Sequence, residues 1–222
     1  EDFYETLWRT NAVGNKHFLR MQEKLKFRMV FTSSSEIYGD FNGVMKEDVP
    51  MKTPIRQLND YAISKWVNEM QIANSIKQFK TESLVVRIFN TYGPGEFYTP
   101  YRSVNCRMLY SALHEKPWVV HHGHGRTSTF LPDTVRTLAN IADNFLSGQV
   151  YNVGGEQYHT IEELSETILR VTGASPDLVH HAEPEPMTTA NKHVDVSKAI
   201  RDLGHVDTVT LDALGHAYGD LK

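Results

Sequence analysis

The sequence predicts an α/β protein with a largely parallel sheet, and three observations support this. Amphipathic helices alternate with short apolar strands along the chain. The candidate strands 26–32 and 83–90 are apolar along most of their length, which is typical of strands buried on both faces. Hydrophobic residues make up 40% and charged residues 23% of the 222 residues, ordinary values for a chain that buries a core.

The first part of the chain predicts two long helices around these strands. Residues 2–24 form an amphipathic helix whose apolar set is Phe3, Leu7, Val13, Phe18, Leu19 and Met21. Glycine, proline and charged residues between 39 and 59 indicate a long loop. Asp60 is expected to cap the helix that carries Tyr61 and Lys65 and continues to about Phe79.

The second part predicts shorter elements. Helices are expected at 103–114, from Pro132 to about 147, after Thr160, and at 195–204. Strands are expected at 118–121, 126–131 and 150–153, and a loop at 180–186. Glu163, three residues after Thr160, makes a capping box.

Charge and composition exclude several kinds of function. A formal net charge of -4 without a basic block argues against general nucleic-acid binding. One cysteine, Cys106, excludes an internal disulfide and fits a reducing compartment. The sequence has neither a membrane-length apolar run nor a signal peptide, so we expect a cytoplasmic protein.

One stretch carries the chemistry. An apolar strand leads into Ser-Ser-Ser-Glu-Ile-Tyr-Gly at 33–39, and Tyr61 and Lys65 follow four residues apart on one helical face. The ammonium can favour the ionised phenol, and a serine hydroxyl at the strand end can complete a proton relay for alcohol–ketone chemistry. A Tyr-x-x-x-Lys pair by itself is also typical of any exposed amphipathic helix.

The order of the motifs narrows the choice. The strand, the 33–39 motif and the Tyr-x-x-x-Lys pair are followed by Val-Arg-Ile-Phe-Asn-Thr-Tyr-Gly-Pro at 86–94, and Asn-Ala-Val-Gly precedes them at 11–14. This order resembles the extended short-chain dehydrogenase/reductase superfamily, and specifically its NAD-dependent nucleotide-sugar epimerases, dehydratases and decarboxylases. The resemblance covers nearly the whole chain. It implies a partial Rossmann-like doubly wound parallel sheet in residues 1–92, a mainly nucleotide-sugar-binding region in 93–222 that sends a strand and helices back to the sheet, and NAD as cofactor.

The glycine-rich turn that holds a dinucleotide's pyrophosphate has no counterpart in the sequence. His-Gly-His-Gly at 122–125 comes nearest, but it lies too late and opens no helix. By the resemblance the chain begins after the family's fourth strand, with about 100 residues of strands and helices lacking. We therefore expect weak NAD binding, and association with itself or with a partner that supplies the other half, because the first strand exposes an apolar edge.

The resemblance implies roles for five residues near the sugar. Ser34 polarises the sugar hydroxyl, Tyr61 is the acid/base at C4, and Lys65 lowers the pKa of Tyr61 and holds the nicotinamide ribose. Glu36 is the candidate base at C5, since a 4-ketone acidifies that position. Glucose-type 4,6-dehydratases carry an aspartate where this chain has Ser35, a substrate-binding candidate, which counts against that subclass.

Other residues match binding positions of the family. Phe89 approaches the nicotinamide, Asn90 the nucleotide-sugar phosphates, and Arg126 clamps the diphosphate. Arg102 is a looser candidate for the substrate pocket. Ser128 replaces a family aromatic residue, so the surroundings of Arg126 are expected to differ from those in the family.

Two groups of side chains are expected to be unrelated to catalysis. Arg87 is interpreted as structural. His121, His122 and His124 lack the spacing of a zinc site, so they indicate a polar loop near the sugar pocket and no metal is predicted.

The resulting hypothesis is an NAD-dependent lyase or isomerase of carbohydrate metabolism. It would be a nucleotide-sugar 4,6-dehydratase or epimerase that acts through a 4-keto-hexose. The alternatives are a nucleotide-sugar decarboxylase, or an inactive remnant or self-associating structural module that lacks the cofactor half.

Overall fold

A computed structural model describes residues 3–209 of the chain. Its centre is a three-stranded parallel sheet in the order β1 (Met29–Ser34), β3 (Ser83–Ile88) and β8 (Val150–Val153). β3 is buried along almost its whole length, as its mostly apolar sequence predicted. The predicted α/β class with a Rossmann-like parallel sheet is confirmed.

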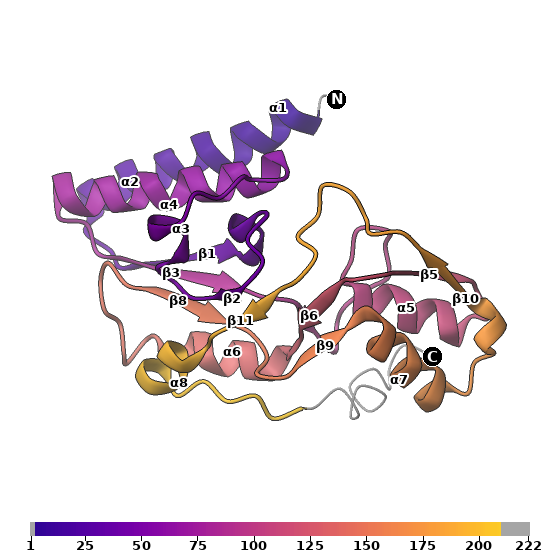
Figure 1. Ribbon diagram of the computed structural model, residues 1–222. Coiled ribbons are helices and arrows are strands. Elements are labelled where there is room, and N and C mark those ends of the chain that lie inside the picture. The colour runs from indigo at the N-terminus through magenta and orange to yellow at the C-terminus, as the bar shows by residue number, and fades with distance from the viewer. Residues whose placement is uncertain (1–2, 210–222) are drawn as a thin grey trace.

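Helices cover both faces of this sheet (Figure 1). One face carries a nearly continuous N-terminal helix and α4 (Asp60–Phe79); the N-terminal helix consists of α1 (Phe3–Trp8), the π-helical turn η1 (Arg9–Val13) and α2 (Gly14–Leu25). The other face carries α6 (Leu131–Asn140) and α8 (Ser197–Leu203). Alternation along β3 explains the two layers, because Val85 packs with Leu19 while Leu84 and Val86 point to the opposite cluster.

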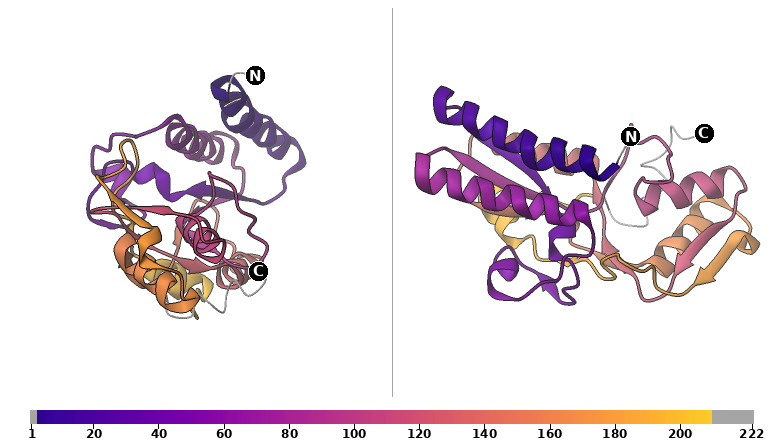
Figure 2. Two further views of the ribbon diagram at one scale, coloured as in Figure 1. Left: turned by 90° about the vertical axis from the view of Figure 1, so that its right-hand side faces the viewer. Right: turned by 90° about the horizontal axis from the view of Figure 1, so that it is seen from above.

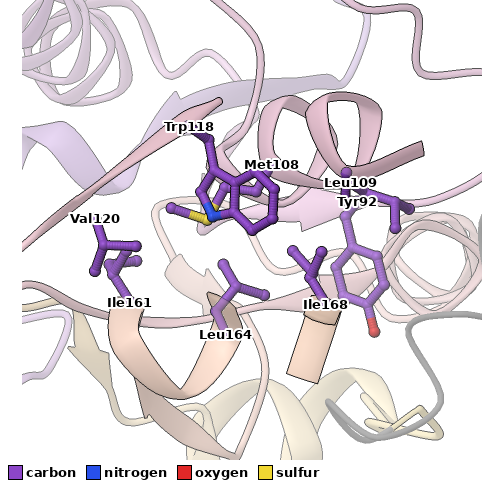
Figure 3. Packing of buried hydrophobic residues seen from close by; sticks show 9 residues of the cluster. Tyr92, Met108, Leu109, Trp118, Val120, Ile161, Leu164 and Ile168 are labelled. Atoms are coloured by element: carbon purple, nitrogen blue, oxygen red, sulfur yellow. The ribbon is translucent and has the colours of Figure 1, made fainter. Parts of the chain in front are cut away.

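A second core lies at the far end of the molecule, as Figure 2 shows from above. It is built by α5 (Val104–Leu113), β5 (Trp118–His121), α7 (Ile161–Thr172) and β10 (Val179–Ala182), with β10 parallel to β5. Trp118, Met108 and Leu164 pack at its centre (Figure 3). The indole nitrogen of Trp118 donates to Ser165 at 2.9 Å, so this buried polar group is satisfied.

Short two-stranded ladders connect the two cores. They are formed by β2 (Val44–Met45) with β11 (His193–Val194), β4 (Thr91–Tyr92) with β7 (Thr129–Phe130), and β6 (Gly125–Thr127) with β9 (Tyr158–Thr160). The β2–β11 ladder joins segments about 150 residues apart, so the end of the described chain returns to the loop after β1. A division near residue 92 stays a prediction.

Most predicted elements are present, with shifted ends. The capping box of Thr160 and Glu163 is formed on both sides. The helix after Pro132 ends at Asn140, well before residue 147, and the 126–131 strand is two short strands that break at Ser128. The 39–59 segment contains β2 and the one-turn helix α3 (Val49–Lys52), and the loop expected at 180–186 begins as strand β10.

Three further expectations were wrong. Asn59, and not Asp60, caps α4, because its side chain accepts the Ala62 N–H at 2.8 Å. β1 is only half-buried, since it pairs with β3 alone among the described strands. In the predicted apolar set of the first helix, Leu19 is buried while Phe3 and Phe18 are exposed, because only one stripe of the helix reaches the sheet.

No helix in the stretch 3–209 combines the length and apolarity needed to cross a membrane.

Candidate active site

The candidate site lies at the carboxyl end of β1, where open α/β sheets bind their ligands. Ser34 ends the strand in extended conformation, and its hydroxyl accepts the Glu36 N–H at 3.2 Å. This bond starts the 3₁₀ turn η2 (Ser35–Tyr38), which carries Glu36 in its first turn. Gly39 closes the turn with φ of 48°, and a Cβ at this residue would collide with the Arg56 carbonyl.

The first turn of α4 brings Tyr61 to this strand end. Asn59 caps the helix and also hydrogen-bonds Glu36, so one residue links the helix start to η2. The Tyr61 hydroxyl is hydrogen-bonded to the Ser34 side chain, and the Glu36 charge acts on it. The structure therefore brings Ser34, Glu36 and Tyr61 together, as the motif spacing predicted.

Lys65 lies one helical turn after Tyr61 along α4. Its ammonium donates to the Thr32 carbonyl at 2.9 Å and lies 5.8 Å from the centre of the Tyr61 ring. Burial lowers the pKa of Lys65, and the Glu69 carboxylate opposes this shift. Lys65 thus stands beside the phenol but is hydrogen-bonded to the strand.

The protonation of Tyr61 differs from the expectation. Burial raises the pKa of Tyr61, the Ser34 hydrogen bond opposes the rise, and the Glu36 charge adds to it. The expected lowering of this pKa by Lys65 is wrong for the structure as it stands, because the ammonium is directed to the Thr32 carbonyl. The phenol is accordingly protonated at neutral pH.

A buried polar network supports the site from behind. Arg87 on β3 makes a two-pronged ion pair with Glu69 on α4, with N–O distances of 3.1 and 2.8 Å. Glu69 also accepts from the Ser33 hydroxyl at 2.5 Å, and Arg87 donates to the Tyr38 hydroxyl at 2.9 Å. Strand β1, turn η2 and helix α4 are thereby tied together, which supports the structural interpretation of Arg87.

Beside these groups opens a cavity of about 300 Å³, the sugar-end cavity, between the two cores. Glu36 lines it together with the predicted substrate-binding residues Asn90, Arg102 and Arg126. Arg126 is held by the carbonyls of Gly125 and Ala190, to which one guanidinium nitrogen donates at 2.8 and 2.6 Å. Three of the predicted binding residues therefore share one cavity with the candidate base.

Lys192 also lines this cavity, and sequence reasoning missed it. Its ammonium forms an ion pair with the Glu36 carboxylate, and the residue is 5% exposed. The two lie 156 positions apart, and no motif marks Lys192, so nothing in the sequence signalled the pair. Burial alone would raise the pKa of Glu36, but the charges of Lys192 and Arg126 hold it below its ordinary value.

Five predicted residues are not among the side chains that line this cavity: Ser34, Tyr61, Lys65, Ser35 and Phe89. The first three belong to the end of β1 and the start of α4, while the last two are buried. Ser35 is buried in η2 and Phe89 is 1% exposed, packed on Tyr38 and against Gly154. Their predicted contacts with substrate and nicotinamide do not match these positions, because the strand ends direct both side chains into the core.

The histidines are divided between two environments. His121 and His124 line the sugar-end cavity, while His122 stacks on His181 with ring centres 5.1 Å apart. No group of three histidine, cysteine, aspartate or glutamate side chains within residues 3–209 is arranged to hold a metal ion. His121, at the end of strand β5, and His124 thus lie at this cavity, whereas His122 is not among its lining residues.

A second cavity, of about 320 Å³, follows the open edge of β1. Lys65, Asn11 and residues 29–32 line it, and none of its described lining residues also lines the sugar-end cavity. Of the predicted cofactor-binding residues Tyr61, Lys65 and Phe89, the described lining contains Lys65. The sequence shows no glycine-rich turn of the kind that holds a pyrophosphate.

The parallel sheet, the helices on both faces and the site at the strand ends define a Rossmann-like α/β protein. A model of the NAD dependent epimerase/dehydratase family matches residues 2–154, and the chain belongs to this family. The predicted family and its NAD dependence are confirmed.

Similar proteins carry several activities. UDP-N-acetyl-alpha-D-glucosaminuronate decarboxylase of Bacillus cytotoxicus is 30% identical over 178 residues, 77% of this chain and 54% of the relative. dTDP-glucose 4,6-dehydratase of Neisseria gonorrhoeae is 27% identical over 230 residues, 92% of this chain and 65% of the relative. The crystal structure of UDP-glucuronic acid 4-epimerase from Bacillus cereus, with UDP-glucuronic acid and NAD, matches with a TM-score of 0.86 at 23% identity, over 96% of this chain and 67% of that one. The chain thus spans about half to two thirds of the length of these proteins.

Proposed function

We propose that the protein acts in the NAD-dependent conversion of a nucleotide-diphosphate hexose through a 4-keto intermediate, as a 4,6-dehydratase or epimerase. The observation that carries this proposal is the hydrogen bond between Tyr61 and Ser34 at a strand end, with Lys65 one turn below. A phenol and a hydroxyl in contact can move one proton to or from a sugar hydroxyl placed between them.

In this proposal Tyr61 exchanges the proton of the sugar 4-hydroxyl while Ser34 orients that hydroxyl. Bound NAD would supply the hydride acceptor and a positive charge that favours the Tyr61 phenolate. Lys65, already beside the Tyr61 ring, would hold the ribose and add to that effect. Because the phenol is protonated in the present structure, it is poised to return a proton when the ketone is reduced.

Glu36 extends the chemistry to C5. Its carboxylate is kept ionised by Lys192 and Arg126, which is the state that a base requires. It lies close enough for its charge to act on Tyr61, as neighbouring atoms C4 and C5 of one sugar demand. Asn90, Arg102 and Arg126 would bind the nucleotide diphosphate in the same cavity.

Decarboxylation of a uronate is the second candidate, favoured by the 30% identical relative and by the serine at position 35. The net charge of the cavity lining distinguishes the dehydratase or epimerase from the decarboxylase. The described lining carries Arg102, Arg107, Arg126 and Lys192 against Glu36 and Glu185, a surplus of two positive charges. A neutral hexose diphosphate balances that surplus, whereas a uronate adds a third negative charge.

The test is formation of reduced cofactor by the purified chain with NAD and UDP-glucose, dTDP-glucose or UDP-glucuronate. Tyr61→Phe should lower this rate by about 10²–10⁴-fold and leave the affinity for the nucleotide sugar within a few-fold. Tyr4→Phe, on the first helix, is the matched control. A chain that neither binds a nucleotide sugar nor reduces NAD would instead be the inactive remnant or structural module.

A further inference from the structure

The ion pair of Glu36 and Lys192 is unusual because it lies inside the sugar-end cavity. Burying an ammonium is costly unless it is paired, and Glu36 is the one side chain that the described residues give Lys192 as a hydrogen-bond partner. An ammonium has three donors, so Lys192 keeps donors for a ligand in the cavity that it lines.

Contacts place these groups in a row. Tyr61 is hydrogen-bonded to Ser34, Ser34 to the Glu36 backbone, and the Glu36 carboxylate to Lys192. A sugar with C4 at Tyr61 and C5 at Glu36 carries C6 onward toward Lys192. Lys192 is thus the charged hydrogen-bond donor next to the candidate C5 base in the cavity.

Loss of water across C5 and C6 needs both a base at C5 and a proton donor for the departing 6-hydroxyl. Ser35 cannot donate that proton, because it is buried in η2 outside the cavity. Lys192 is the ammonium beside the candidate base, and burial lowers its pKa, which makes it a better donor.

We propose that Lys192 is the general acid of a 4,6-dehydration, donating its proton to the 6-hydroxyl while Glu36 removes the C5 proton. This rests on the proposed function and selects its dehydratase form. The C5–H electron pair becomes the C5–C6 double bond, the C6–O bond breaks, and the oxygen leaves as water with the Lys192 proton. A 4-keto-6-deoxy sugar would then form when the hydride taken from C4 returns to C6 and Glu36 returns its proton to C5. The proton that Tyr61 took from the 4-hydroxyl restores the Lys192 ammonium, so protons and electrons balance.

Electrostatics favours this step. The elimination converts a carboxylate and an ammonium into a neutral acid and a neutral amine within a buried pair. Two charged groups in a dry site pay a desolvation cost that the neutral pair avoids. The positive charge of Arg126 acts on both residues. It repels the Lys192 ammonium and so favours loss of a proton from it.

The experiment supplies the chain with NAD and with UDP-glucose or dTDP-glucose in deuterated water. It measures deuterium at C5 and the 4-keto-6-deoxy product separately. Lys192→Met should lose water about 10²–10⁴-fold more slowly while deuterium still enters C5. Lys192→Arg keeps the ion pair, and hence the fold, but its guanidinium holds its proton, so it should be as slow in water loss. Lys77→Met, an exposed lysine on α4, should match the wild type.

A substrate analogue with a fluoride leaving group tests the role of Lys192 as general acid separately from its other roles. Fluoride departs with little need for protonation, so the 6-deoxy-6-fluoro analogue should lose fluoride at nearly the wild-type rate in Lys192→Met. Equal water loss in wild type and Lys192→Met, or equal slowing for hydroxyl and fluoride, would overturn the general acid and leave the 4-keto chemistry standing. A wild-type chain that forms no reduced cofactor would contradict the proposed function itself, and this inference with it.

Discussion

Replacing Arg87 by methionine tests whether the buried network holds the site together. The Arg87 side chain is 2% exposed and the Glu69 side chain 6%, and methionine removes both prongs of their ion pair. Glu69 would then keep a buried carboxylate whose remaining side-chain partner in the described structure is the Ser33 hydroxyl. Removing one partner of such a pair costs about 3–5 kcal/mol, a large share of a total stability of roughly 5–15 kcal/mol.

The assay is equilibrium unfolding in urea, followed by circular dichroism. The variant in which Glu69 and Arg87 both become methionine should recover most of the loss, because it leaves no unpaired charge. Arg20→Met, on an exposed face of α2, is the matched control and should stay within about 0.5 kcal/mol of the wild type. A loss for Arg87→Met as small as that of the control would refute the reasoning.

Three further outcomes are expected. Glu36→Gln should abolish deuterium incorporation at C5 while hydride transfer at C4 continues, and unchanged incorporation would mean that another group is the base. The folded-state pKa of Glu36 lies below its ordinary 4.5, so the ionised carboxylate stabilises the fold above that pH and this stabilisation is lost as the pH falls. The stability of Glu36→Gln should therefore fall less steeply than that of the wild type below pH 4.5. Identical stability–pH profiles of the two proteins would contradict this. The open edge of β1, where Val30 is 42% exposed, should make the chain associate, and NAD should bind weakly because the sequence shows no glycine-rich turn for the pyrophosphate. A monomer in light scattering with micromolar NAD affinity in calorimetry would contradict this.

The sequence by itself determined the elements and the order in which they meet. Helix α4 and strands β3 and β8 follow from local periodicity, and the Thr160–Glu163 capping box from a three-residue spacing. A helix that follows a parallel strand starts near that strand's carboxyl end, so Ser34 at the end of β1 and Tyr61 on the first turn of α4 could be expected to meet. These features depend on hydrogen bonds and side-chain spacings within a few residues, or on strand direction alone.

Only the tertiary structure decided which side chains face the cavity. Phe89 and Asn90 are neighbours in the chain, yet Phe89 is buried in the core, where it packs against Tyr38, and Asn90 lines the cavity. Lys192 reaches Glu36 from 156 residues away through the return of the chain along the β2–β11 ladder. Such a partnership depends on where two distant segments pack, and no local pattern of residues encodes it.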